Sequence, residues 1–372
     1  MNPELAPGTG EVEVRSGPDG TVVVAPPAIA ALAEGAAGPD TLVLAAAGAH
    51  LTWNLFSDNY IPAAVLDDPD LAQQWIWAVY GEEVALAVAD FDGVPRRAIA
   101  RPARPLLAAA ARRLAYAHWA ARWWPASAID AIAALDDRLL ATEITTLTGE
   151  CEMLVDGADA LDEADPDDEF GTMRTVADAG EFGTMRALAD AGEFGTVPTL
   201  GRADDYALAV GAADVDATAR DATVLARGVT GWDWYRCPPG ILDASERAVS
   251  WEVVRADGAT DVRVRAVAAP GLRGLVPEHL RPTAFGAAIP PTPLVLSGDH
   301  WQGLAPLVDP AAPVTVTVRV PGMGPAESVP AEELRHRIRD FATTRLRRAA
   351  QAHDDPYDTP LLAEIAAAEA DY

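Results

Sequence analysis

An acidic and repetitive segment in the middle of the chain limits what the rest of it can fold into. Between Glu150 and Glu169 there are ten carboxylates and no arginine. A twelve-residue sequence that begins at Glu169 recurs at Glu181 and, in truncated form, at Glu193. Repeats this short and this few cannot share the core that a solenoid needs. The pattern predicts an acidic low-complexity linker, residues 151–202, between two separately folded parts.

The repeat itself has two interpretations. Duplication of a tolerated surface segment would leave near-identical copies that have no role in binding. A repeated recognition motif would instead offer one aromatic side chain per copy to a partner, namely Phe170, Phe182 and Phe194. We favour the first interpretation, because it requires no binding function.

The part before the linker, residues 1–150, is predicted to be an α+β domain with a helical segment. Glu-Val-Glu-Val-Arg from Glu11 and Thr-Val-Val-Val up to Val24 flank a Gly- and Pro-containing turn, which is typical of a β-hairpin. Apolar residues recur at three- and four-residue steps after Pro105, which indicates a helix that Pro125 ends. Further strands are predicted at 41–44 and 84–91. A second helix is predicted after Ser127 as N-cap, with Ile129, Ile132, Leu135, Leu139 and Leu140 on its buried side.

The part after the linker, residues 203–330, is predicted to be an antiparallel β-rich, sandwich-like domain. Predicted strands at 249–255 and 261–267 flank an Asp257-Gly258 turn, and residues 314–320 alternate between apolar and polar. The pairs Pro238-Pro239 and Pro290-Pro291 are predicted to lie in loops. Helices in residues 331–372 would close the domain, the first with acids in its first turn and arginines in its last. The predicted fold class is therefore α+β.

Composition excludes several functions. All 28 basic residues are arginine, so no lysine is present to form a Schiff base, hold pyridoxal phosphate or complete a phosphate-binding loop. We predict no cofactor and no metal. The net charge of −28 disfavours both a nucleic acid and an anionic membrane surface as partners.

The compartment is inferred from what the sequence lacks. No apolar run is long enough to span a bilayer, and the first residues have no basic and apolar stretch of the secretory kind. Cys151 and Cys237 could form one bridge, but two distant cysteines are more typical of reduced, buried thiols. We expect a cytoplasmic bacterial protein.

The sequence contains none of the compact catalytic or metal-binding motifs, and two clusters are catalytic candidates. Asp299 and His300 follow a predicted strand and could act as acid and base. Cys237 lies beside Arg236, which would favour its thiolate, so it could act as a nucleophile. A structural turn and a buried thiol are the simpler interpretations of these two features.

Two groups of residues are candidates for binding. Trp232, Trp234 and Trp301 could line a cleft of the β-rich domain, although tryptophans entering such a domain usually belong to its core. Arg335, Arg339 and Arg347 belong to an arginine-rich predicted helix that could bind an anion or an acidic partner. The simpler interpretation is that this helix pairs with carboxylates of the same chain.

The hypothesis that we favour is a non-enzymatic interaction protein, an adaptor or assembly component that binds another protein. The alternatives are a hydrolase-like enzyme with a site between the two ordered parts, and a small-ligand-binding β domain.

Overall fold

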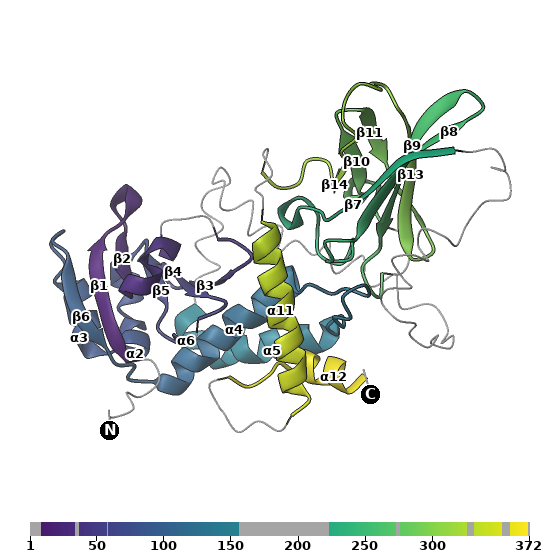
Figure 1. Ribbon diagram of the computed structural model, residues 1–372. Helices are drawn as coiled ribbons and strands as arrows, with labels where there is room; N and C mark the ends of the chain where they lie inside the picture. Colours follow the sequence, from purple (N-terminus) through teal and green to yellow (C-terminus); the bar gives the residue numbers. More distant parts are fainter. Residues whose placement is uncertain are drawn as a thin grey trace, which may run out of the picture. The chain divides into compact units, whose positions relative to one another are not determined.

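The computed structural model describes residues 9–33, 37–57, 59–155, 223–272, 276–325, 331–351 and 358–370 (Figure 1). The chain divides into two compact units. Unit 1 comprises residues 1–123, 135–178 and 344–372, and unit 2 comprises residues 124–134 and 179–343. Helices and antiparallel sheets occur together, and the C-terminal β-rich region ends in a helix, which confirms the predicted α+β class. The predicted linker and its repeats lie outside the described residues from residue 156 onward.

A six-stranded antiparallel sheet forms the first part of unit 1. Its strands are β1 (Gly10–Ser16), β2 (Val22–Ala25), β3 (Thr41–Ala46), β4 (Ala49–Asn54), β5 (Ala63–Leu66) and β6 (Arg96–Ala100), in the order β3-β4-β5-β2-β1-β6. The predicted hairpin is confirmed, because β1 pairs with β2 in antiparallel register. Asp19 and Gly20 have positive φ values of 55° and 85° in a turn between the two strands. The strand predicted at 41–44 is confirmed as β3.

Helices complete unit 1. They are α1 (Pro69–Ala72), α2 (Ile76–Tyr80), α3 (Glu82–Ala89), α4 (Pro105–Trp123), α5 (Asp137–Glu150), α6 (Glu152–Val155) and α12 (Leu362–Ala370). Large aromatic side chains fill the core, and their polar atoms find backbone partners. The Trp75 indole donates to the Ala47 carbonyl over 2.8 Å, and the Tyr80 hydroxyl donates to the Pro62 carbonyl over 3.2 Å.

The strand predicted at 84–91 is wrong, because this segment forms α3. Valines favoured a strand, but a short apolar run cannot be assigned by its pattern alone. Val84, Ala85 and Val88 are buried at spacings of one and three residues, as one face of a helix requires. Gly81 precedes the helix with φ of 92°, and a Cβ on it would lie 2.2 Å from the Arg101 carbonyl oxygen. Glycine therefore fixes where α3 begins.

The second predicted helix begins later than we predicted. Asp136, not Ser127, caps it, and the Asp136 side chain accepts from the N–H groups of Arg138 and Leu139. Ile129 and Ile132 are buried as predicted, but in an irregular segment. Ser127 and Ile132 form an isolated antiparallel bridge there, so the chain turns back on itself instead of winding into a helix.

Unit 2 contains two antiparallel sheets. The five-stranded sheet has the order β12-β13-β9-β8-β7, and the three-stranded sheet has the order β11-β10-β14. The strands are β7 (Thr223–Thr230), β8 (Val249–Ala256), β9 (Ala259–Val267), β10 (Thr283–Gly286), β11 (Ile289–Pro293), β12 (Val295–Ser297), β13 (His300–Pro306) and β14 (Thr317–Arg319). The predicted β8–β9 hairpin is confirmed, with positive φ at Asp257 and Gly258.

Two details of the β-rich prediction are wrong. Pro290 and Pro291 lie within β11 and not in a loop. β11 is an edge strand, and its register with β10 shifts between Ile289 and Thr292, so the two prolines lie in an irregular part of the pairing. The strand predicted at 314–320 is confined to the three residues of β14.

Helix α11 (Glu332–Ala349) confirms the predicted C-terminal helix. Its first turn contains Glu332 and Glu333 and its last contains Arg347 and Arg348, charges that suit the helix dipole. Residues 332–343 of the helix belong to unit 2, and residues 344–349 belong to unit 1.

Candidate functional site

Asp243 organises the polar centre of unit 2. Its side chain is completely buried and accepts hydrogen bonds from the Ser127 hydroxyl at 2.7 Å, the Ala128 N–H at 2.7 Å and the Ser245 N–H at 2.9 Å. Burial raises the pKa of Asp243, and these hydrogen bonds oppose the rise. One carboxylate thereby holds residues 127–128 against residues 243–245 of the same unit.

The predicted tryptophans support this segment. The Trp232 indole donates to the Asp243 carbonyl over 2.6 Å, and the Trp301 indole donates to the Ile241 carbonyl over 3.0 Å. The ring of Trp234 lies 6.3 Å from that of Trp232. All three side chains are buried, so they pack in the interior and present no open aromatic surface.

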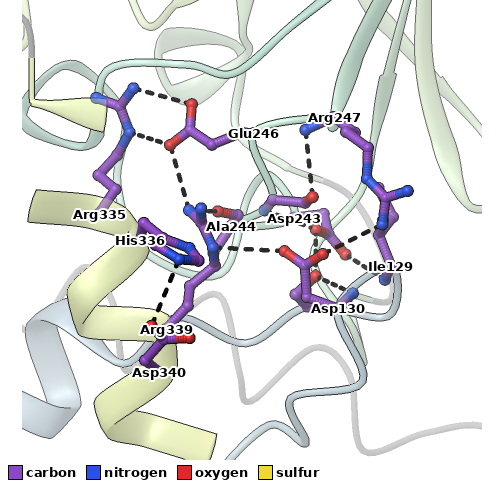
Figure 2. A network of polar contacts seen from close by, with 12 residues as sticks. Ile129, Asp130, Asp243, Ala244, Glu246, Arg247, Arg335, His336, Arg339 and Asp340 are labelled. Carbon is purple, nitrogen blue, oxygen red and sulfur yellow. Dashed lines mark hydrogen bonds and ion pairs between the residues drawn. The ribbon is translucent and has the colours of Figure 1, made fainter. Parts of the chain in front are cut away.

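Ion pairs connect α11 to the rest of unit 2 (Figure 2). Arg335 binds both carboxylate oxygens of Glu246, at 2.6 and 3.0 Å. Arg339 donates to Glu246 and to the Ala244 carbonyl, each at 3.2 Å, and its guanidinium lies 3.5 Å from Asp130. These arginines are mostly buried, and they form ion pairs with a carboxylate of the same unit.

Arg347 differs from the other two predicted arginines. It is exposed, and it belongs to the part of α11 that lies in unit 1. The sequence pattern placed all three on one helix but could not distinguish the two that bind carboxylates distant in the chain from the one that faces solvent.

Unit 1 has a buried ion-pair cluster of its own. Arg345 binds both oxygens of Glu364, at 2.9 and 2.8 Å, and the Tyr116 hydroxyl donates to Glu364 over 2.6 Å. Arg345 also donates to Asp358 over 2.5 Å. Burial and the Glu364 charge raise the pKa of Tyr116. The cluster attaches α12 to α4 and so has a structural role.

The structure brings Asp299 and His300 together at the start of β13. Their side chains approach to 3.1 Å, and the Asp299 carboxylate is largely exposed. Cys237 follows the short 3-10 helix Trp234–Arg236 and is 1% exposed. The other cysteine, Cys151, is also buried, and burial together with the Glu150 charge raises its pKa to about 12. Both thiols are buried, whereas reactive cysteines are typically partly exposed.

The five-stranded sheet has one face with exposed side chains, which we call the open face. Residues directly opposite each other in antiparallel strands lie on the same face. The register therefore places Val295, Gln302, Arg265, Ser250 and Val229 in one row and Leu304, Arg263, Glu252 and Arg227 in the next. On the other face, Ala266, Val264 and Val262 of β9 are buried.

Apolar residues are exposed on this sheet, which the sequence interpretation did not single out. They are Val224, Leu225 and Val229 of β7, Val295 of β12 and Leu304 of β13. Valine and leucine in a predicted strand usually belong to a core. Their exposure depends on the order of the strands, which a single sequence does not reveal.

Comparison of the chain with protein-family models, with curated proteins and with solved structures gave no match. Among the residues that the structure describes, no group of three or more metal-ligating side chains is suitably placed for a metal ion. Within the same part of the chain, no helix is both long and apolar enough to cross a membrane.

Proposed function

We propose that the chain is a non-catalytic adaptor or assembly protein of the bacterial cytoplasm, and that it binds another protein through the five-stranded sheet of unit 2. The observation that supports this is the group of exposed apolar side chains on β7, β12 and β13. They lie toward the two edges of the sheet, and apolar patches that polar residues surround are typical of protein-binding surfaces. Arginine, which is enriched in such surfaces, lies between them at Arg227, Arg263 and Arg265.

Two alternatives have less support. A hydrolase could use the Asp299–His300 contact, but a Cys237 nucleophile would have to become exposed first. A small-ligand-binding β domain could use Trp232, Trp234 and Trp301, but their side chains are buried and two of the indoles already donate to backbone carbonyls.

Site-specific photo-crosslinking in the host cell tests the proposal. A photoreactive amino acid at Leu304, which is 59% exposed on the open face, should yield one discrete adduct with a partner protein. The same amino acid at Leu86 of α3, which is 56% exposed in unit 1, is the matched control and should yield none. Absence of an adduct from Leu304, or identical adducts from both positions, would contradict the proposal.

A further inference from the structure

We propose that β7 accepts an extended acidic segment of a partner protein as a sixth strand of the five-stranded sheet. This inference rests on the proposed function, because it names the place and the chemistry of the partner's binding. Strand addition is a common mode of peptide recognition, in which main-chain hydrogen bonds provide affinity and alternate side chains provide specificity.

The edge strands of unit 2 differ in how well they could pair with a further strand. Edge strands β12 and β14 each have three residues. Edge strand β11 contains Pro290, Pro291 and Pro293, which have no N–H group to offer a further strand. Edge strand β7 has eight residues and no proline. Because shortness and proline are two ways in which proteins block sheet edges, β7 is the open edge among the described strands of this unit.

One side of the β7 backbone has no strand partner among the residues that the structure describes. Among the described strands, β8 alone pairs with it. In antiparallel pairing, alternate residues direct their N–H and C=O groups toward the neighbour, and the residues between them direct theirs away. A bulge between Val224 and Ala226 distorts the first residues of β7. Residues 226–230 remain in regular register and can form an ordinary ladder.

The side chains of β7 indicate an acidic partner. Arg227 is exposed and lies opposite Glu252, which in turn lies opposite Arg263. Two guanidinium groups thus flank one carboxylate, and the unbalanced positive charge lies at the edge. Val229, on the same face, is 62% exposed. A partner strand would therefore place a carboxylate opposite Arg227 and an apolar side chain opposite Val229.

A second copy of this chain fits the edge less well. Antiparallel pairing of two β7 strands would bring two Arg227 side chains close together. Charge therefore favours a different protein with an acidic, extended segment.

The test uses labelled, capped peptides of sequence Thr-Val-Thr-Glu-Thr-Val-Thr, which present Val, Glu and Val on one face of a strand. A second version has Lys in place of Glu. A third has N-methyl groups on Glu and on the Thr before it, which block hydrogen bonding along both peptide edges. Fluorescence anisotropy measures affinity for the full chain, and hydrogen exchange locates the site.

The Glu peptide should bind and slow amide exchange in residues 223–230. The Lys version should bind about fivefold more weakly, as expected for one exposed cross-strand charge pair, and the N-methylated version should not bind. Arg227→Glu should reverse the preference between the Glu and Lys peptides. The control Arg347→Glu makes the same change of charge in unit 1 and should retain the preference for the Glu peptide.

Several results would overturn the proposal. The Glu peptide could fail to bind at concentrations up to about 1 mM, or the N-methylated peptide could bind equally well. The Glu peptide could also slow amide exchange elsewhere in the chain and not in β7. Self-association that Arg227→Glu abolishes would identify a second copy as the occupant instead. If Leu304 crosslinks to a partner while the peptides fail, strand addition is wrong and the proposed function stands. Peptide binding without a Leu304 crosslink would support strand addition at the β7 edge and show that the partner does not cover the open face near Leu304.

Discussion

At the scale of single residues, the buried Asp243 carboxylate connects two segments of unit 2 that are distant in the sequence. Four donors surround its carboxylate, namely the Ser127 hydroxyl and the N–H groups of Ala128, Ile129 and Ser245. Three of them belong to a segment more than a hundred residues earlier in the sequence. Removal of the acceptor would leave these donors without a partner in the protein interior, which costs more than the hydrogen bonds themselves contribute.

We therefore expect Asp243→Ala to lower the free energy of unfolding by about 2–4 kcal/mol. Asp243→Asn should cost less, because its amide oxygen can still accept from some of these donors. Urea denaturation monitored by tryptophan fluorescence measures both values. A change below about 0.5 kcal/mol for Asp243→Ala, as for an ordinary surface residue, would show that the segment is held by other contacts.

The wild type and Asp243→Asn should differ in how their free energy of unfolding depends on pH. Burial raises the pKa of Asp243 in the folded state, so the folded protein binds this proton more tightly than the unfolded chain does. The contribution of Asp243 to stability is therefore greatest in acid and falls as the pH rises from about 4, its unfolded pKa, through the folded pKa. The stability of the wild type relative to Asp243→Asn should decrease over this range. An increase would mean that the hydrogen bonds to the carboxylate outweigh its burial.

At the scale of elements, α11 shows how residues of one helix can have different roles. Arg335 and Arg339, four residues apart on one face, bind Glu246 (Figure 2). Arg347 lies on the exposed side. Substitution of the exposed Arg347 is therefore a control for substitution of the buried Arg339 in the same helix.

Arg339→Ala should lower the free energy of unfolding by about 2–4 kcal/mol, because it leaves Glu246 and Asp130 with fewer partners in partly buried positions. The matched variant Arg347→Ala should change it by less than about 0.5 kcal/mol. Both substitutions favour a helix equally, so the difference reports the ion pairs. Equal effects in thermal and urea denaturation would contradict this role of Arg339.

Local patterns determined how much of these elements could be predicted. The β1–β2 and β8–β9 hairpins and α11 were predictable, because turn residues and terminal charges act within a few positions of each other. The Asp299–His300 contact joins neighbours in sequence. In contrast, the partners of Arg335 and Arg339 lie about ninety or more positions away along the chain, and the exposure of β7 follows from strand order. No pattern within a short window contains this information.

At the scale of the whole molecule, each unit is assembled from separate stretches of the chain. Unit 1 includes residues 344–372, and unit 2 includes residues 124–134. The buried clusters around Glu364 and Asp243 lie where these stretches pack within their units. Asp243 and Glu364 at their centres are fully buried, so both clusters favour one register of packing, because a shifted register would leave charges unpaired.

The charge of the whole chain leads to a last prediction. With a net charge of −28, repulsion among carboxylates opposes the compact state. Between 0.1 and 1 M NaCl the screening length falls from about 10 Å to about 3 Å, which weakens this repulsion more than it weakens the buried ion pairs. The melting temperature should therefore rise by a few degrees. Calorimetric scans in NaCl measure this effect without the additional stabilisation that sulfate produces by exclusion from the protein surface.

The control for the salt experiment is pH. Near the pI of about 4.4 the net charge vanishes, so the rise of the melting temperature with NaCl should disappear. A melting temperature that falls with salt at neutral pH would mean that attractive pairs such as Arg335–Glu246 outweigh the repulsion among the remaining carboxylates. In that case the acidic composition would stabilise the fold through local pairing, and the net charge would have little effect on stability.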